Sequence, residues 1–166
     1  MRKSRLTLAL VGLAVAMLAL PALSVAGRNT TELQAELTGK AEVPGPGSKK
    51  GKGEITVAMK PTQNKVCFDL EVKKLDTITD GHIHKGEEGV AGDVKVPLFE
   101  GDQLEGTGAY EGCVKDVKKK LIKKIIAKPE KFYVNIHTED YPDGAIRGQL
   151  ELVEDDTEDE DETETE

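Results

Sequence analysis

Apolar and polar residues alternate in short runs along the middle of the chain. The clearest apolar sets are Leu33, Ala35 and Leu37, then Ile55, Val57 and Met59, then Val66, Phe68, Leu70 and Val72. A period of two residues is typical of strands that bury one face and expose the other. The pattern predicts further strands at residues 78–84, 94–98, 106–114, 132–138 and 145–153. The joins are rich in Gly, Pro and Asp, which favour turns, so about eight short strands predict an all-β fold, an antiparallel Greek-key sandwich or barrel.

One segment departs from this alternation and predicts a short α-helix. Asp116 is expected to cap it, the apolar residues of 117–127 recur at helical spacing, and Pro129 ends it. Eight Lys lie between positions 115 and 131. We expect the helix to close one end of the barrel with its Lys side chains in water. The alternatives are that this Lys face binds an anion or a membrane surface, or that the acidic end of the same chain pairs with it.

Charge divides the 166 residues into three parts. The net charge is −8, yet residues 27–153 carry 20 basic and 21 acidic residues and are nearly neutral. Residues 154–166 contain ten acidic residues, no basic residue and no apolar one, which predicts a solvated, disordered tail. A near-neutral body of this length fits one ordinary domain and excludes both a multidomain enzyme and a dedicated nucleic-acid binder.

The first 26 residues have the features of a signal peptide. Arg2, Lys3 and Arg5 precede an apolar run at 6–20, and Ser24 and Ala26 are the small residues that signal peptidase accepts. We expect cleavage after Ala26 and a secreted, periplasmic or cell-surface protein with no membrane span after cleavage. The alternative is an anchor that is never removed, although the apolar run is shorter than the roughly 20 residues that span a bilayer.

Cys67 and Cys113, the two cysteines of the chain, lie in different predicted strands. Two cysteines in an exported protein are expected to form a disulfide. The alternative, a pair of thiols that bind metal or undergo redox chemistry, lacks the CxxC spacing that would support it.

The three histidines predict a metal site. His82 and His84 are one residue apart on a strand, so their rings project from the same face, and His137 is placed so that a neighbouring strand can present a third ring. Three imidazoles suit copper or zinc and leave a coordination position open. The alternative is that the three rings form hydrogen bonds within the barrel and bind no metal.

Five stretches resemble the chordin-type, or CHRD, domain. In order they are Leu37-Thr-Gly-x-x-Glu42-Val43-Pro44, Val66-Cys67-Phe68, GHIHKGEEGVAGDV at 81–94, EGCV at 111–114 and YVNIHTEDYPDGAIRGQL at 133–150. The resemblance, to the single-domain secreted microbial type, runs from about residue 33 to 152. It implies an immunoglobulin-like or Greek-key β-barrel, and it identifies a fold better than an activity, although animal chordin binds bone morphogenetic proteins.

A more distant resemblance concerns the histidines. HIH followed by Gly, a later V-x-I-H and the Arg in AIRG are similar to the copper half of Cu/Zn superoxide dismutase. That likeness implies that His82, His84 and His137 are copper ligands and that Arg147, near the site, is the cation that attracts superoxide. The bridging histidine and the remaining zinc ligands have no counterpart, because the chain has no fourth histidine. Arg147 pairing with Glu139 or Asp140 is the alternative.

These patterns together favour an exported, monomeric binding module over an enzyme, since no nucleophile–base pair, phosphate loop or catalytic carboxylate pair stands out. We expect domains at 1–26, a signal peptide, at 27–153, a CHRD domain, and at 154–166, the acidic tail. The expected partner is an extracellular protein or matrix ligand. A superoxide dismutase-like copper enzyme, or a structural domain that binds a partner through the Lys-rich helix, are the alternative functions.

Overall fold

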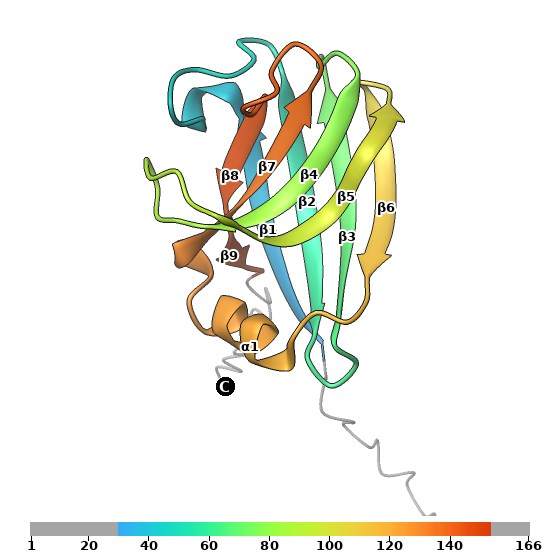
Figure 1. Cartoon of the computed structure of the whole chain (residues 1–166), viewed down its shortest axis with the longest axis vertical. Coiled ribbons are helices and arrows are strands. Elements are labelled where there is room, and N and C mark those ends of the chain that lie inside the picture. The colour runs from blue at the N-terminus through green and yellow to red at the C-terminus, as the bar shows by residue number, and fades with distance from the viewer. Residues whose placement is uncertain (1–29, 154–166) are drawn as a thin grey trace, which may run out of the picture.

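The strands predicted by the alternation pair into one antiparallel sheet in a computed structural model, which describes residues 30–153 (Figure 1). The predicted signal peptide and acidic tail lie outside the described residues. The strands are β1 (Thr31–Thr38), β2 (Lys52–Lys60), β3 (Lys65–Lys73), β4 (Ile78–Lys85), β5 (Val94–Leu104), β6 (Gly108–Val114), β7 (Phe132–Thr138), β8 (Ile146–Gln149) and β9 (Glu151–Leu152). One α-helix, α1 (Lys119–Ala127), and two single turns of 3₁₀ helix, η1 (Gly39–Ala41) and η2 (Pro129–Lys131), complete the fold.

The sheet curls into a nearly closed barrel, which confirms the predicted fold class. The strands follow the order β5-β4-β7-β8-β1-β2-β3-β6, and the short β9 pairs with β1 beside β8. Strands that are distant in sequence are therefore neighbours, as Greek-key connections require. The first and last strands of this order, β5 and β6, also contact each other, so the sheet leaves little open edge.

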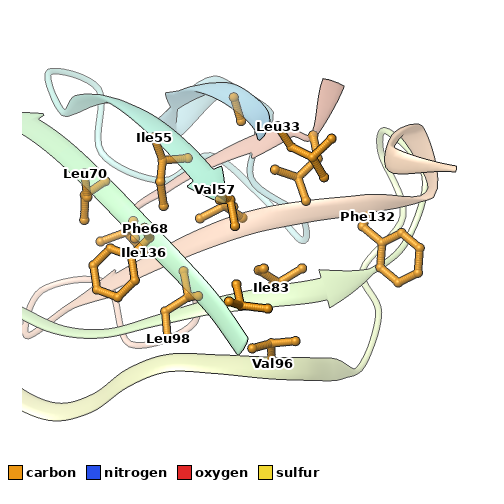
Figure 2. Close-up of a cluster of buried hydrophobic side chains, with 14 of the residues drawn as sticks. Leu33, Ile55, Val57, Phe68, Leu70, Ile83, Val96, Leu98, Phe132 and Ile136 are labelled. Carbon is orange, nitrogen blue, oxygen red and sulfur yellow. The ribbon is translucent and has the colours of Figure 1, made fainter. Parts of the chain in front are cut away.

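The alternating apolar residues all point into the barrel and form its core. In the β1–β2–β3 register, Leu33 lies opposite Val57, and Val57 lies opposite Phe68, so the three inward faces coincide. Figure 2 shows how side chains from both halves of the barrel meet, with Ile83 and Ile136 facing the β2–β3 residues. Both isoleucines are fully buried. This inward apolar face leaves the outward face of β4 and β7 free for polar side chains.

The helix forms where expected but begins later. α1 starts at Lys119, after Lys118 as its N-cap, and no side chain caps its first turn. The prediction that Asp116 caps the helix is wrong, because Asp116 adopts a left-handed φ of 61° and forms part of the turn before the helix. The amide of Val117 instead donates to the carbonyl of Asn64, which ties this turn to the β2–β3 connection. Ile122 and Ile125 of α1 are fully buried in the core cluster. Figure 1 shows α1 below the strands, at one end of the barrel.

Two predicted strands differ from the structure in extent. The run at 145–153 divides at Leu150 into β8, which pairs with β7, and β9, which pairs with β1. Gly148 allows the close packing there, since a Cβ would lie 2.1 Å from the carbonyl oxygen of Glu36. β5 runs six residues beyond the expected end at 98, through the polar segment that includes Glu100. No alternation marks that extension, so a strand could not be predicted there from the pattern of apolar residues.

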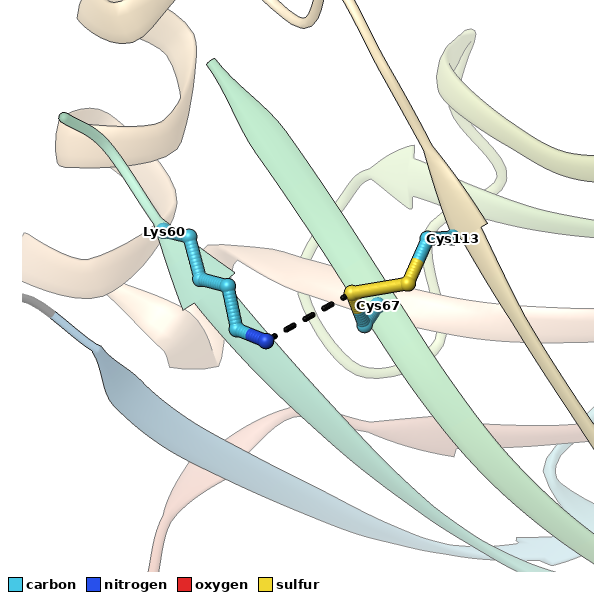
Figure 3. The surroundings of a disulfide bond; sticks show 3 residues. All are labelled: Lys60, Cys67 and Cys113. Carbon is cyan, nitrogen blue, oxygen red and sulfur yellow. Dashed lines mark hydrogen bonds between the residues drawn. A yellow bond between two sulfur atoms is a disulfide. The ribbon is translucent and has the colours of Figure 1, made fainter. Parts of the chain in front are cut away.

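Cys67 and Cys113 form the predicted disulfide. They are directly opposite each other in the β3–β6 register, and the bond lies on the outer face of the barrel (Figure 3). The ammonium of Lys60 lies 3.7 Å from the sulfur of Cys67. The disulfide thus links β6, at one end of the strand order, to the rest of the sheet.

Within residues 30–153, no helix has the length and apolar character needed to cross a bilayer.

Candidate metal centre

The structure brings the three histidines together on the outer face of β4 and β7. His82 and His84 lie on β4, and His137 lies on β7, the neighbouring strand. The ring centroids of His82 and His137 are 5.0 Å apart, and those of His82 and His84 are 5.5 Å apart. One nitrogen from each ring lies within 4.8 Å of the corresponding nitrogen in the other two. Such a cluster is capable of holding a metal ion.

Each imidazole is oriented by a hydrogen bond from its other nitrogen. Nδ1 of His84 lies 2.8 Å from the carbonyl oxygen of Gly92, and Nδ1 of His137 lies 2.9 Å from that of Pro142. Nε2 of His82 lies 3.2 Å from a carboxylate oxygen of Glu100. A carbonyl only accepts, and an ionised carboxylate only accepts, so each of these nitrogens carries the proton. When the rings are neutral, they present His82 Nδ1, His84 Nε2 and His137 Nε2 as lone pairs.

These three lone pairs lack suitable partners among the described residues. His82 Nδ1 lies 3.2 Å from His137 Nε2, so two acceptors face each other at hydrogen-bond distance. His84 Nε2 is buried and makes no hydrogen bond to any part of the described chain. A buried polar atom without a partner is costly, and two facing lone pairs repel. A cation among the three nitrogens would remove both defects.

One nitrogen–nitrogen distance fits a metal site, and the cluster as a whole is slightly wider than a bound ion allows. Two ligands at about 2.1 Å from a metal are about 3.4 Å apart at a tetrahedral angle and about 4.2 Å apart when opposite each other. The 3.2 Å between His82 and His137 therefore fits a shared ion. The upper limit of 4.8 Å across the cluster exceeds the opposite-ligand distance by about half an ångström. Binding one ion at normal bond lengths therefore requires at least one ring to move inward.

Burial keeps two of the rings in the form that binds metal. Desolvation lowers the pKa of His84, against the hydrogen bond to the Gly92 carbonyl, and repulsion between protonated His84 and Arg147 or a second protonated ring lowers that pKa further. Desolvation also lowers the pKa of His137, against the opposing effects of the hydrogen bond to the Pro142 carbonyl and of the Asp80 and Asp143 carboxylates. Because a metal binds the unprotonated nitrogen, lower pKa values favour binding at neutral pH.

The β4–β5 loop holds His84 from outside the sheet. The Gly92 carbonyl accepts from His84, while the Gly92 amide donates to the hydroxyl of Tyr133. The rings of His84 and Tyr133 stack, with centroids 4.8 Å apart and an angle of 9° between their planes. A Cβ on residue 92 would lie 1.8 Å from the carbonyl oxygen of Lys85, so only glycine fits this close approach. Residue 92 is therefore part of the support of the site.

Arg147 lies beside this support and is almost fully buried, at 2% exposure. Its guanidinium carbon lies 3.4 Å from the ring centroid of Tyr133, and its Nη2 donates to the carbonyls of Glu87 and Val90. No ion pair within residues 30–153 joins Arg147 to Glu139 or Asp140, the pairing that the sequence offered as an alternative. The guanidinium thus holds the loop that covers His84, acting through Tyr133.

A second buried polar pair lies next to this group. The amide of Asn135 donates to both carboxyl oxygens of Glu42, at 2.9 and 3.1 Å. Burial raises the pKa of Glu42 to about 7, although the charge of Arg147, the Asn135 amide and the Val43 N–H each lower that pKa. Gly144 has a φ of 138°, and a Cβ there would lie 2.6 Å from a carboxyl oxygen of Glu42. Glycine at this turn therefore leaves space for the pair.

Sequence reasoning identified the three histidines but missed the groups that orient them. Glu100 belongs to the part of β5 that has no alternation, and the carbonyls of Gly92 and Pro142 carry no side-chain signal. Tyr133 shares its parity with His137 on β7, which places it on the polar face, but its stacking partner comes from β4. Only the fold brings these groups to the histidines.

Comparison with known families finds that the CHRD domain model matches residues 33–150, most of the chain. That range contains the three histidines, both cysteines and Arg147. Comparisons with curated proteins and with solved structures found no match.

Proposed function

This chain belongs to the CHRD family, and we propose that it is an exported binding module that holds one copper or zinc ion through His82, His84 and His137. The family supports a binding module, and the disulfide supports an oxidising, extracellular setting. The proposal adds to this binding module a metal site on the outer face of the barrel.

One observation carries the proposal: in the three clustered rings, when they are neutral, the nitrogen that is not bonded to an outside acceptor has no donor among the described residues. Each ring gives its proton to an outside acceptor, Glu100, Gly92 or Pro142, in the arrangement by which proteins orient metal-ligating histidines. A cluster that served only for internal hydrogen bonding would pair His84 Nε2 with a donor, yet that atom is buried and unpaired among the described residues.

The donor set favours a borderline transition metal. Three neutral imidazoles without a thiolate or a carboxylate ligand suit Cu²⁺ and Zn²⁺ and disfavour Mg²⁺ and Ca²⁺, which prefer oxygen. His137 is partly exposed whereas His82 and His84 are 9% exposed, so a bound ion would meet solvent or a further ligand on the His137 side. Through this open position, the bound ion would coordinate a donor atom of a second molecule, as a binding module requires.

Calorimetric titration with Cu²⁺ and with Zn²⁺ tests the site. We expect one saturable ion per chain, and nitrogen couplings in the electron paramagnetic resonance spectrum of the Cu²⁺ form. The His84→Ala variant should lose this binding, while Lys85→Ala, an exposed neighbour on the same strand, should retain it. A chain lacking residues 154–166 should also retain it, because the expected ligands are the histidines and not the carboxylates of that segment. Cu²⁺ bound by carboxylates alone would show no nitrogen couplings. Failure to bind in the unmodified chain would leave the histidines with a structural role only.

The competing function is a superoxide dismutase-like copper enzyme on the same residues. It requires Arg147 as an accessible cation, yet the guanidinium is buried and engaged with loop carbonyls. Burial of that charge favours the binding module. Copper-loaded protein should therefore dismutate superoxide no faster than the His84→Ala variant supplied with the same copper. Faster, His84-dependent turnover would establish the enzyme instead.

A further inference from the structure

The outward side of α1 and its flanking turns forms an exposed basic surface, which we call the Lys surface. It comprises Lys115, Lys118, Lys119, Lys120, Lys123, Lys124 and Lys128, all of them exposed. The opposite side of the helix buries Ile122 and Ile125 against the barrel, so α1 is fixed in place. Like charges on one short helix repel one another. Within residues 30–153, no carboxylate makes an ion pair with any of these seven lysines.

The chain itself continues from a point close to this surface. β9, the final strand, lies against η2, the turn that directly follows α1 (Figure 1). The amide of Val153, the last described residue, donates to the carbonyl of Glu32, so the segment beyond it starts from this end of the barrel. Residues 154–166 contain ten acidic residues and three threonines. A thirteen-residue segment reaches up to roughly 40 Å, whereas the nine residues of α1 span about 14 Å.

We propose that residues 154–166 dock on the Lys surface of their own chain and cover it against other polyanions. The charges are opposite and similar in number, and both partners belong to one molecule. Attachment at Val153 gives the segment a high effective concentration at α1, which a separate polyanion must exceed. Exposed ion pairs are individually weak and are screened by salt, so the docked segment exchanges rapidly and is released at high ionic strength.

Amide shifts measured by NMR, with and without residues 154–166, test the docking. We expect removal of the segment to shift the resonances of residues 115–128, and 1 M NaCl in the intact chain to produce the same shifts. The differences should not depend on protein concentration, because docking occurs within one chain. Shifts confined to the residues next to Val153 would overturn the proposal. So would shifts that grow with concentration, since these would place the segment on a second copy.

Poly-L-glutamate is the competitor that tests covering. The chain lacking residues 154–166 should bind it about tenfold more tightly than the intact chain at low salt. A variant with Lys120, Lys123 and Lys124 replaced by Gln should be compared with and without residues 154–166. In this variant, removal of the segment should no longer shift the resonances of residues 115–128. The matched control replaces Lys49, Lys50 and Lys52, three exposed lysines in and beside the start of β2, and should leave those shifts intact. Equal affinity of intact and shortened chains for poly-L-glutamate would show that the surface is not covered.

Discussion

Nδ1 of His82 lies 3.2 Å from Nε2 of His137, although each ring directs its other nitrogen to an acceptor. Two strands bring these atoms together: His82 lies opposite Asn135 on β7, and Asp80, two residues before His82, lies opposite His137. The rings therefore meet diagonally across the β4–β7 pair. The contact is poor for two neutral imidazoles and favourable once an ion is shared, so we expect metal to affect these two rings strongly.

Metal should stabilise the fold. An ion that binds only the folded chain raises the free energy of unfolding by about 2.7 kcal/mol at a concentration one hundred times its dissociation constant. Differential scanning fluorimetry with excess Zn²⁺ should therefore show a rise of several degrees in Tm. The His137→Ala variant should show no such rise. An equal rise in both proteins would place the ion elsewhere.

Glu100 should act on the metal site as a positioning residue. Its carboxylate accepts from His82 Nε2 and so holds Nδ1 toward the other two rings. Loss of such an orienting partner typically lowers metal affinity 10- to 100-fold. We expect Glu100→Gln to weaken Zn²⁺ binding within about that range without changing the one-to-one stoichiometry. Glu88→Gln, at an exposed position in the β4–β5 loop, is the matched control and should bind as the original chain does. Unchanged affinity in Glu100→Gln would remove its assigned role.

Glu42 should make stability decrease as the pH rises. Its pKa is about 7 in the folded chain and about 4.5 in the unfolded chain, so between these values the folded state holds one proton more. Stability from this group is therefore greatest below pH 4.5 and falls until pH 7, by at most about 3 kcal/mol. Urea unfolding from pH 5 to 8 should show this fall, and Glu42→Gln should flatten it. An equal slope in both proteins would assign the pH dependence to other groups.

Arg147 should be needed for stability. Replacement by Ala removes the donor to two loop carbonyls and the cation that stacks on Tyr133. We expect Arg147→Ala to lower the free energy of unfolding by roughly 3 kcal/mol or more. Arg147→Lys should recover only part of it, because an ammonium cannot reproduce the planar fork. A loss below about 1 kcal/mol in chemical denaturation would contradict the role assigned to the guanidinium.

The disulfide should contribute chiefly by restricting the unfolded chain. Cys67 and Cys113 are 46 residues apart in sequence, and a closed loop of that length stabilises by about 4 kcal/mol on the chain-entropy model. The double variant Cys67→Ser, Cys113→Ser should lose stability of that order in urea unfolding while keeping the same far-ultraviolet circular dichroism. Because the bond lies on the outer face, metal binding should persist in the folded double variant. Loss of metal binding with the fold intact would couple the disulfide to the histidines.

The sequence by itself determined the strands, the disulfide and the identity of the candidate ligands. A period of two is a local property, so the positions of Leu33, Ala35 and Leu37 predict the buried face of β1 without reference to any other strand. The same parity placed His82 and His84 on one face, away from Ile83. Asp116 shows where local reasoning fails, because its left-handed conformation depends on a turn that is anchored to Asn64.

Only the tertiary structure decided what surrounds those ligands. Glu100, Gly92 and Pro142 come from three separate segments, and each reaches its histidine through loop geometry or a strand extension that has no periodic signal. By its position in the sequence, Arg147 resembled the arginine that attracts superoxide in Cu/Zn superoxide dismutase. In the fold, its guanidinium instead packs against the ring of Tyr133 and is buried. Hydrophobic alternation specifies which way a side chain points, whereas its neighbours on that face are set by strand order and loop closure, which are properties of the whole fold.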